Sequence, residues 1–336
     1  MTIDEAMQLG RQYHQAGRLA EAEALYRQVL ATAPNYPPAL HLIGVLAGQV
    51  GRLELAIDLI ARSTQIDPNN ALAWNDLSVF LKNCGRTDES IDACKRSIAL
   101  EPGYGAAFSN LAAALIEHGD YHAGEVAARK AIDLSPSNGD AFFNLAGALR
   151  GMGKFAEAIE ALRVSIRSRP DYGDAHANLG WVLLLTGNFS EGWTETLSTL
   201  QSFDSFEGAT RLLTHQLWNG EQVPKGTILL YADKGLGDTL QFIRYLPMVA
   251  ARVGRIIVLC QSELLRLLSD RPHADMVLRM HDPLPAFEAR YPISSLPALF
   301  RTDLESMPPM TPLRPDDKIL VAWKNRVGQR SDRLRV

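Results

Sequence analysis

The sequence predicts an α-helical solenoid followed by an incomplete α/β unit, and three observations carry this prediction. Prolines recur at 34-residue steps, at Pro34, Pro68, Pro102, Pro136 and Pro170. Glycines recur with the same period, at Gly17, Gly51, Gly85, Gly119, Gly153 and Gly187. After about residue 207 the period stops, and short apolar runs typical of strands replace it. A fixed period of this length is typical of proteins built from stacked repeats.

Each period predicts two helices. The segment FFNLAGALRGMGKFAEAIEALRVSIRSRP has apolar residues at three- and four-residue spacing on both sides of its glycine turn. Glycine permits the left-handed conformation that closes the first helix, and proline cannot continue the second. Six such hairpins fit residues 3–206, although Asp204 stands where the sixth closing proline belongs. We expect the last helix, through EGWTETLSTLQSF, to cap the stack and join the next unit.

The repeats resemble the tetratricopeptide repeat family. Repeat one carries Leu9, Gly10, Tyr13, Ala22 and Tyr26 at the family's positions. The resemblance implies a right-handed superhelical solenoid over residues 1–206 that binds a protein or peptide in its groove.

One polar series lies on the first helices. Asp76, Asn110, Asn144 and Asn178 are 34 residues apart, and Gln8 and Leu42 take the equivalent places in the first two repeats. One interpretation is that polar residues simply occupy an exposed position. The other is a peptide-binding groove, because asparagine amides donate to and accept from an extended backbone. A similar asparagine ladder lines the concave face of O-linked N-acetylglucosamine transferase.

Composition narrows the function classes. Residues 1–204 carry 16 basic and 24 acidic side chains, whereas residues 205–336 carry 18 and 14, which indicates two units with different partners. The acidic repeat region argues against nucleic acid as a partner, despite a basic C-terminal segment. No apolar run is long enough for a membrane span, and no secretory signal precedes the first repeat, so we expect a cytoplasmic protein. The three cysteines lack the spacing of metal ligands, so no metal is expected.

The C-terminal third predicts a parallel sheet. After a linker at 207–225 come the runs TILLYA, RIIVLC, MVLRM, YPISS and KILVAW, and helical segments separate the earlier ones. Alternating strands and helices favour a Rossmann-like arrangement over residues 226–317. KILVAW would open a second domain over residues 318–336. Because its partner strands are missing, we expect it to join the edge of the first sheet or to lie exposed.

The turn after the first strand, DKGLGDTLQ, is the main candidate for chemistry in this region. Gly235 and Gly237 form part of a glycine motif, but Leu240 stands where a dinucleotide fingerprint needs its third glycine, so no nucleotide cofactor is expected. Asp238 and Gln241 have the spacing of a helix N-cap with a capping box. This structural role and a functional role for Asp238 are compatible.

The same segment, with WNG before it and YPISSLPALF after it, resembles the first domain of bacterial glycosyltransferases that carry tetratricopeptide repeats and have the GT-B fold. The resemblance implies that Asp238 is the base that deprotonates an acceptor hydroxyl. It also implies that Gly235, Gly237, Thr239 and Gln241 bind the acceptor. A nucleotide sugar would be the substrate, and neither a cofactor nor a metal would be needed.

The family's donor-binding domain lies downstream of the residues that the sequence contains. We therefore expect a protein-binding repeat scaffold attached to the acceptor-side half of a glycosyltransferase-like domain, without catalytic activity of its own. The alternative is a glycosyltransferase that moves a sugar from a nucleotide sugar to a protein or glycan hydroxyl. Whether the chain is an enzyme stays open at this point.

Overall fold

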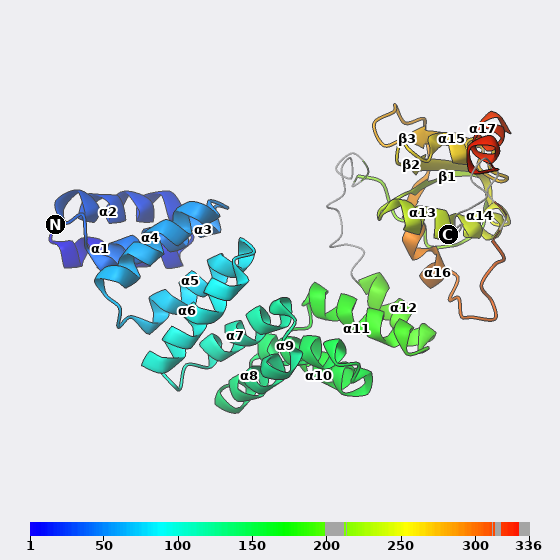
Figure 1. Cartoon of the computed structure of the whole chain (residues 1–336). Helices are drawn as coiled ribbons and strands as arrows, with labels where there is room; N and C mark the ends of the chain where they lie inside the picture. The colour runs from blue at the N-terminus through cyan, green and yellow to red at the C-terminus, as the bar shows by residue number, and fades with distance from the viewer. Residues whose placement is uncertain (199–211, 213, 311, 313–316, 329–336) are drawn as a thin grey trace. The chain divides into compact units, whose positions relative to one another are not determined.

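A computed structural model describes residues 1–198, 212, 214–310, 312 and 317–328, and the chain divides into two compact units. Unit 1 is Met1–Ala175 and unit 2 is His176–Val336 (Figure 1).

Unit 1 is built from helix pairs, as the period predicts. The pairs are α1 (Ile3–Gln15) with α2 (Leu19–Thr32), α3 (Pro37–Gln49) with α4 (Leu53–Ile66), α5 (Ala71–Asn83) with α6 (Thr87–Leu100), α7 (Gly105–His118) with α8 (Tyr121–Leu134), and α9 (Gly139–Gly151) with α10 (Phe155–Ser168). The second helices α2, α4, α6 and α8 also pack on the first helix of the following repeat. Buried apolar clusters extend across the first and second repeats and across the second and third.

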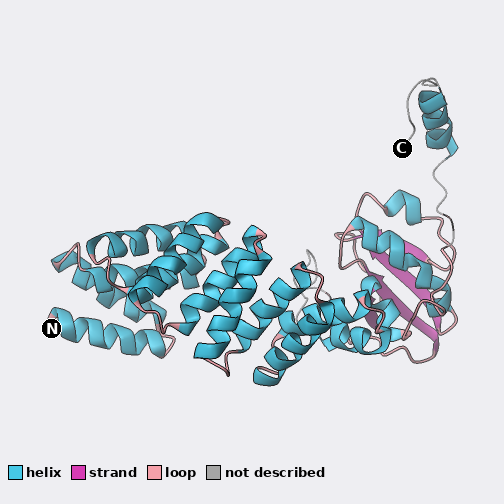
Figure 2. Ribbon diagram, turned by 60° about the horizontal axis from the view of Figure 1, so that its bottom comes forward, coloured by secondary structure: helices cyan, strands magenta, loops and turns pink. Residues whose placement is uncertain are grey.

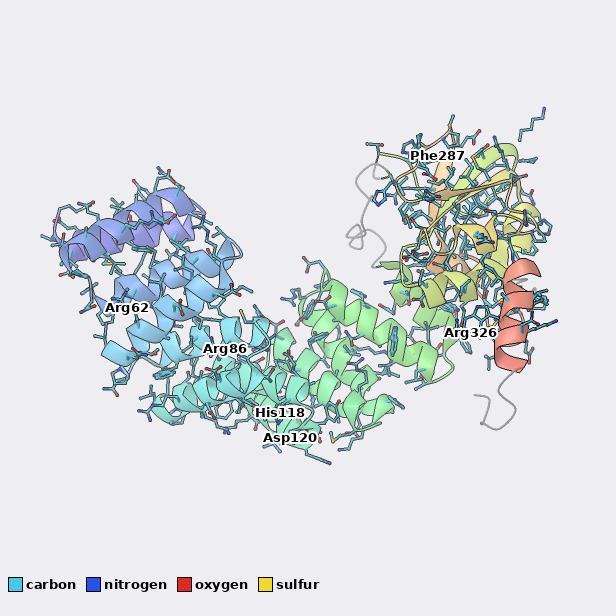
Figure 3. The ribbon with its side chains drawn as sticks, turned by 45° about the horizontal axis from the view of Figure 1, so that its top comes forward. Arg62, Arg86, His118, Asp120, Phe287 and Arg326 are labelled. Atoms are coloured by element: carbon cyan, nitrogen blue, oxygen red, sulfur yellow. The ribbon has the colours of Figure 1, made fainter. Side chains whose placement is uncertain are left out.

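The two predicted turn signals have the expected roles. All six periodic glycines adopt positive φ, from 72° at Gly17 to 92° at Gly119, where the Cβ of any other residue would be strained. His118 and Asp120 flank one of these turns at the edge of unit 1 (Figure 3). Each second helix that precedes a periodic proline ends two residues before it.

Close packing inside a pair depends on small residues. Tyr26 of α2 is fully buried, and a Cβ placed on Gly10 of α1 would lie 2.5 Å from its ring. The absence of a side chain at Gly10 therefore makes the space that the tyrosine ring fills.

The sixth helix pair consists of α11 (Gly173–Leu185) and α12 (Phe189–Ser198). Within unit 2, α12 packs on α16 (Leu296–Leu299), and the indole N–H of Trp193 donates to the carbonyl of Thr302 at 2.6 Å. The last repeat helix thus joins the α/β part of the chain, as the sequence predicts.

Unit 2 contains a four-stranded sheet with strand order β3-β2-β1-β4, in which every neighbouring pair is parallel (Figure 2). The strands are β1 (Val223–Tyr231), β2 (Val253–Cys260), β3 (Met276–Arg279) and β4 (Ala289–Pro292). The helical segment after β1 comprises α13 (Leu236–Phe242), the 3₁₀ turn η2 (Ile243–Tyr245) and α14 (Leu246–Ala250). The remaining short helices are α15 (Leu265–Leu268) and the 3₁₀ turn η3 (Ile293–Ser295).

The sheet buries apolar side chains on both faces. The α14 and α16 side chains share one buried cluster with Ile228, Leu230 and Val258, while Leu229 and Leu259 belong to a cluster on the other face. This double burial explains why β1 and β2 are nearly continuous apolar runs.

The prediction for KILVAW is wrong. These residues, 318–323, lie in helix α17 (Asp317–Gly328), not in a strand, and the side chains of Val321 and Trp323 are exposed. An isolated strand leaves its backbone N–H and C=O groups without ladder partners, whereas a helix pairs them internally. The expectation that this segment would lie exposed is the part that agrees with the structure.

The capping prediction also needs correction. Helix α13 begins at Leu236, and Gly235 is its N-cap, with an extended backbone and no side-chain cap. Asp238 is therefore an acidic residue in the first turn instead of the cap. A carboxylate in this position still interacts favourably with the helix dipole.

Candidate functional site

The predicted polar series occupies one position on successive first helices. Asp76, Asn110 and Asn144 are the sixth residues of α5, α7 and α9, and all three side chains are half-buried. Gln8 and Leu42 are the sixth residues of α1 and α3. We call the surface formed by these five residues the ladder face. Asn178, the sixth residue of α11, is also half-buried.

The ladder side chains connect neighbouring repeats. The Nδ2 of Asn144 donates to the carbonyl oxygen of Ser109 at 2.9 Å and lies 3.1 Å from its hydroxyl oxygen. The Nδ2 of Asn110 donates to the Oδ1 of Asn75 at 2.8 Å.

The same link is made by an acid and an imidazole one repeat earlier. The Nε2 of His41 lies 2.8 Å from Asp76 Oδ2, and His41 is buried. Each of these links spans 35 residues, one more than the length of a repeat. The partner is therefore always in the preceding repeat, one residue before the ladder position.

Sequence reasoning missed these partner residues. His41, Asn75 and Ser109 are themselves 34 residues apart, which is the signal that was available. Their chemistry differs from repeat to repeat, so they do not form a recognisable series of one residue type. The structure therefore adds a role that neither sequence interpretation contained, because the ladder links the first helices of successive repeats.

The ladder face is hollowed at its N-terminal end. A pocket of about 430 Å³ surrounds Gln8. It is lined by Asp4, Met7, Gln8, Arg11, Gln12, Gln15 and Tyr36. Most of these side chains are polar, so this end of the face offers both donors and acceptors to a ligand.

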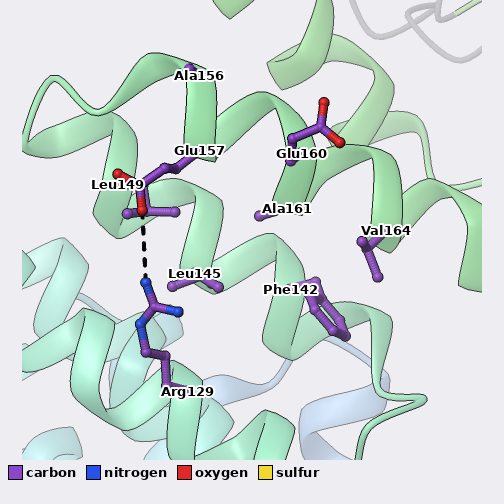
Figure 4. A pocket seen from close by; sticks show the side chains of 9 residues that line it. All are labelled: Arg129, Phe142, Leu145, Leu149, Ala156, Glu157, Glu160, Ala161 and Val164. Carbon is purple, nitrogen blue, oxygen red and sulfur yellow. Dashed lines mark ion pairs between the residues drawn. The ribbon is translucent and has the colours of Figure 1, made fainter.

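A second pocket, of about 460 Å³, lies among α8, α9 and α10 (Figure 4). Leu145, Leu149 and Val164 contribute to its apolar wall. Arg129 at its rim forms an ion pair with Glu125 at 2.8 Å and lies 3.9 Å from Glu157. The rim charges are thus already paired within the chain.

In unit 2, the predicted turn residues separate into buried and exposed ones. Gly235, Gly237, Asp238 and Gln241 are exposed, whereas Thr239 is buried. The Thr239 hydroxyl donates to Oε1 of Gln261 at 3.1 Å, and the Gln261 side-chain amide donates to the carbonyl of Lys234 at 2.7 Å. Gln261 follows β2 directly, so it fixes the glycine turn to the carboxyl end of the neighbouring strand.

Another carboxylate of the turn is the half-buried Asp233, which the sequence did not single out. It accepts hydrogen bonds from the backbone N–H of Ser294, at 3.2 Å, and from the Ser294 hydroxyl. Burial raises the pKa of Asp233, and the two Ser294 hydrogen bonds partly oppose that rise. Asp233 thereby joins the carboxyl ends of β1 and β4, between which the strand order reverses. Ligands of open parallel sheets bind in the crevice at such a reversal.

Across residues 1–198 and the other described ranges, no group of three His, Cys, Asp or Glu side chains is arranged to hold a metal ion. Within those same ranges no helix is both long and apolar enough to cross a membrane.

Comparison with known proteins supports the repeat assignment. Models described as tetratricopeptide repeat match residues 13–79, 71–104, 109–162 and 148–192, which together cover more than half of the chain. No curated protein matches the sequence.

Several solved structures have a similar fold. PilW, described as a widely conserved type IV pilus biogenesis factor, is 18% identical with a TM-score of 0.55, and the match covers 63% of this chain and 98% of PilW. Pseudomonas aeruginosa pilF is 16% identical with a TM-score of 0.53, covering 63% and 96%. A chain of the APC/C hetero-tetramer Cut9-Hcn1 is 16% identical with a TM-score of 0.56, covering 63% and 42%. At these identities the similarity shows the fold alone.

Proposed function

Because this chain belongs to the tetratricopeptide repeat family, we propose that it is a scaffold that binds a protein partner, and that an extended segment of the partner lies along the ladder face. The single observation that carries the proposal is the alignment of Asp76, Asn110 and Asn144, whose half-buried side chains follow one another along successive first helices.

Amide chemistry supports an extended peptide as the ligand. A side-chain amide has two N–H donors and a carbonyl acceptor, and Asn110 uses one donor in its link to Asn75. Its intrachain bond fixes the orientation of the amide, so its remaining groups are held in place for a ligand. Such pre-organisation lowers the ordering cost of binding.

The apolar neighbours of the ladder supply contact area. Leu72 lies four residues before Asp76 on the same face of α5, and its side chain is 50% exposed. An exposed leucine beside fixed polar groups provides burial for a ligand side chain. The arrangement fits a peptide that pairs its backbone with the ladder and packs one side on α5.

A selection experiment tests this proposal. We expect random peptides displayed on phage to yield binders when selected on the 336-residue chain. Asn110→Ala and Asn144→Ala should each weaken binding of a selected peptide about fivefold, as the loss of one oriented hydrogen bond of about 1 kcal/mol predicts. Asn69→Ala, in the exposed turn before α5, is the matched control and should leave affinity unchanged. Selected peptides that bind all variants equally would contradict the proposal, provided that circular dichroism shows each variant to be folded.

We propose a second candidate function, in which the chain is a glycosyltransferase that moves a sugar from a nucleotide sugar to a protein or glycan hydroxyl and Asp238 of unit 2 is the base. Two observations favour it. The glycine turn lies at the carboxyl edge of a parallel sheet beside the reversal of strand order. Packing does not require the glycines, since a Cβ on Gly237 would meet no atom within 4 Å and Gly235 has an ordinary extended backbone. Their small size is thus available for a close ligand, with Thr239 and Gln241 beside it.

Titration with nucleotide sugars tests the second candidate. Saturable binding of one UDP-, GDP- or ADP-linked sugar to the whole chain is the expected result. Asp238→Asn should retain that binding but lose transfer to an acceptor hydroxyl, because only the proton acceptor is removed. Absence of saturable binding to the folded chain, or transfer by the Asp238→Asn variant at the unaltered rate, would exclude this role.

A further inference from the structure

Unit 2 buries an arginine within its parallel sheet. Arg290 is the second residue of β4, and it is only 7% exposed. Its main chain is held on both sides. It pairs with Leu229 of β1 on one side, and on the other it forms hydrogen bonds of 3.0 and 2.9 Å with Gln216 and Trp218. The backbone from which the guanidinium extends therefore has a fixed place in the fold.

The hydrogen-bond partners of the Arg290 guanidinium carry no charge. Its Nε donates to the carbonyl of His215 at 3.2 Å, and its Nη1 donates to the hydroxyl of Tyr231 at 2.9 Å. His215 is itself held, because its ring stacks on that of Phe287 with centroids 4.3 Å apart (Figure 3). In the described part of the chain, no aspartate or glutamate forms an ion pair with Arg290. A buried charge is normally paired, since its removal from water costs free energy.

The guanidinium keeps donors that the protein does not use. It has five N–H groups, and the bonds to His215 and Tyr231 use two of them, which leaves both on Nη2 and one on Nη1. Among the described residues, the side-chain nitrogen that is buried without a partner is Nε of Arg244. Nη2 of Arg290 is therefore accessible to water, although most of its side chain is buried. A fixed cation with accessible donors matches the chemistry of a carboxylate or phosphate oxygen.

The position of Arg290 in the sheet independently points to a ligand. Tyr231 is the last residue of β1, and its hydroxyl accepts from the guanidinium of β4. The strand order reverses between these two strands. Asp233 and Ser294 connect the same strands just beyond their carboxyl ends. Open parallel sheets bind ligands in the crevice at such a reversal, so the buried cation lies between the two strands that border this crevice.

We propose that Arg290 binds an oxyanion, the carboxylate or phosphate group of a small-molecule ligand, through Nη1 and Nη2. The ligand would supply the negative charge that the described residues do not place beside the buried guanidinium. Tyr231 and His215 are positioning residues, because they fix the orientation of the guanidinium before a ligand arrives. The inference goes beyond both proposed functions, since it requires neither a bound peptide nor the transfer of a sugar.

Three variants separate this role from a general effect of charge. Arg290→Lys keeps the positive charge but loses the planar fork of donors. Arg290→Met removes the charge and keeps an unbranched side chain that fills part of the buried space. The matched control is Arg255→Met, which makes the same charge change at an exposed residue near the amino end of β2. Circular dichroism first establishes that each variant is folded.

Inorganic phosphate and acetate are the probes. Each is titrated into the whole chain at an ionic strength kept constant with chloride, and binding is followed by the nuclear magnetic resonance signals of the Tyr231 ring. We expect a saturable shift with at least one anion, and the tighter of the two identifies a phosphate or a carboxylate as the group recognised. Arg290→Lys should weaken this binding about tenfold, as the loss of an oriented charge-assisted hydrogen bond predicts. Arg290→Met should abolish it, and Arg255→Met should leave it unchanged.

Three results would overturn the site. They are the lack of a saturable shift with either anion, unchanged affinity in Arg290→Met, and an equal loss in Arg255→Met. If Arg290→Met does not fold, Arg290→Lys decides, and equal affinity in that variant overturns the site. Failure of the anion site leaves peptide binding by the ladder face untouched, because that face belongs to unit 1. Binding of phosphate by a chain that binds no nucleotide sugar would exclude the second candidate function and retain the anion site.

Discussion

Replacing Asn144 by alanine should weaken the contact between the fourth and fifth repeats. The substitution removes the donor group that reaches both the carbonyl and the hydroxyl oxygen of Ser109, at 2.9 and 3.1 Å. Each intramolecular hydrogen bond contributes about 1 kcal/mol net. Because Asn144 is only half-buried, water replaces part of this, and we expect a loss of about 1 to 2 kcal/mol in the free energy of unfolding.

Urea unfolding followed by circular dichroism measures this loss, with Asn69→Ala as the control that should stay within about 0.5 kcal/mol of the unaltered protein. A double-mutant cycle with Ser109→Ala isolates the hydroxyl bond, which should give a coupling energy of about 0.5 kcal/mol or more. Hydrogen exchange should localise the effect to α7 and α9, because the stability of repeat proteins depends on nearest-neighbour contacts. If Asn144→Ala matches Asn69→Ala, the ladder does not stabilise the stack and the linking role is wrong.

Three further predictions concern other parts of the chain. Gly48→Ala should lower the free energy of unfolding by about 1 to 3 kcal/mol in the same urea assay, since the new Cβ would lie 2.0 Å from the Phe80 ring. Gly103→Ala should leave that free energy unchanged, because a Cβ on Gly103 would meet no atom within 4 Å. Burial raises the pKa of both Cys94 and Cys260 to about 11, so mild alkylation at ~pH 8 should label only the half-buried Cys84, as mass spectrometry can show. Rapid labelling of Cys94 in the folded chain would contradict its burial. Because the pKa of Asp233 is raised, its contribution to stability is fully present below the unfolded pKa of aspartate and is lost as pH rises through the folded value. The melting temperature of Asp233→Asn, taken relative to that of the unaltered protein, should therefore be higher at neutral pH than at acidic pH. A constant difference across that range would show that Asp233 keeps an ordinary pKa.

The repeat part of the fold follows from the sequence because its determinants are local. A glycine at each Gly17-equivalent position and a proline after each of the first five second helices act within one turn of the chain, so these helix ends were predictable without tertiary information. The strand runs at TILLYA and RIIVLC were predictable for a related reason, since burial on both faces leaves an unbroken apolar run.

KILVAW was mispredicted because strand formation depends on neighbours that the segment itself does not encode. The same apolar residues suit a helix when no ladder partner is present. Composition of a short apolar run does not distinguish the two outcomes.

The candidate sites were predictable in position but only partly in role. The period placed Asp76, Asn110 and Asn144 on one face, but their partners vary in type between repeats, and only coordinates reveal the 35-residue links. In unit 2 the glycine turn drew attention to the exposed Asp238, whereas the carboxylate whose pKa burial raises is the half-buried Asp233. Its partner, Ser294, lies 61 residues away, and the parallel pairing of β1 with β4 brings them together.

Site-specific photo-crosslinking tests the central claim, protein binding along the ladder face, most directly. A photoreactive phenylalanine analogue is placed at Leu72, which is 50% exposed beside Asp76, or at Val126, which is 71% exposed on α8. With a peptide selected on the whole chain, we predict crosslinks from position 72 and none from position 126. Crosslinks from position 126 alone would place the binding surface on the second helices and contradict the account.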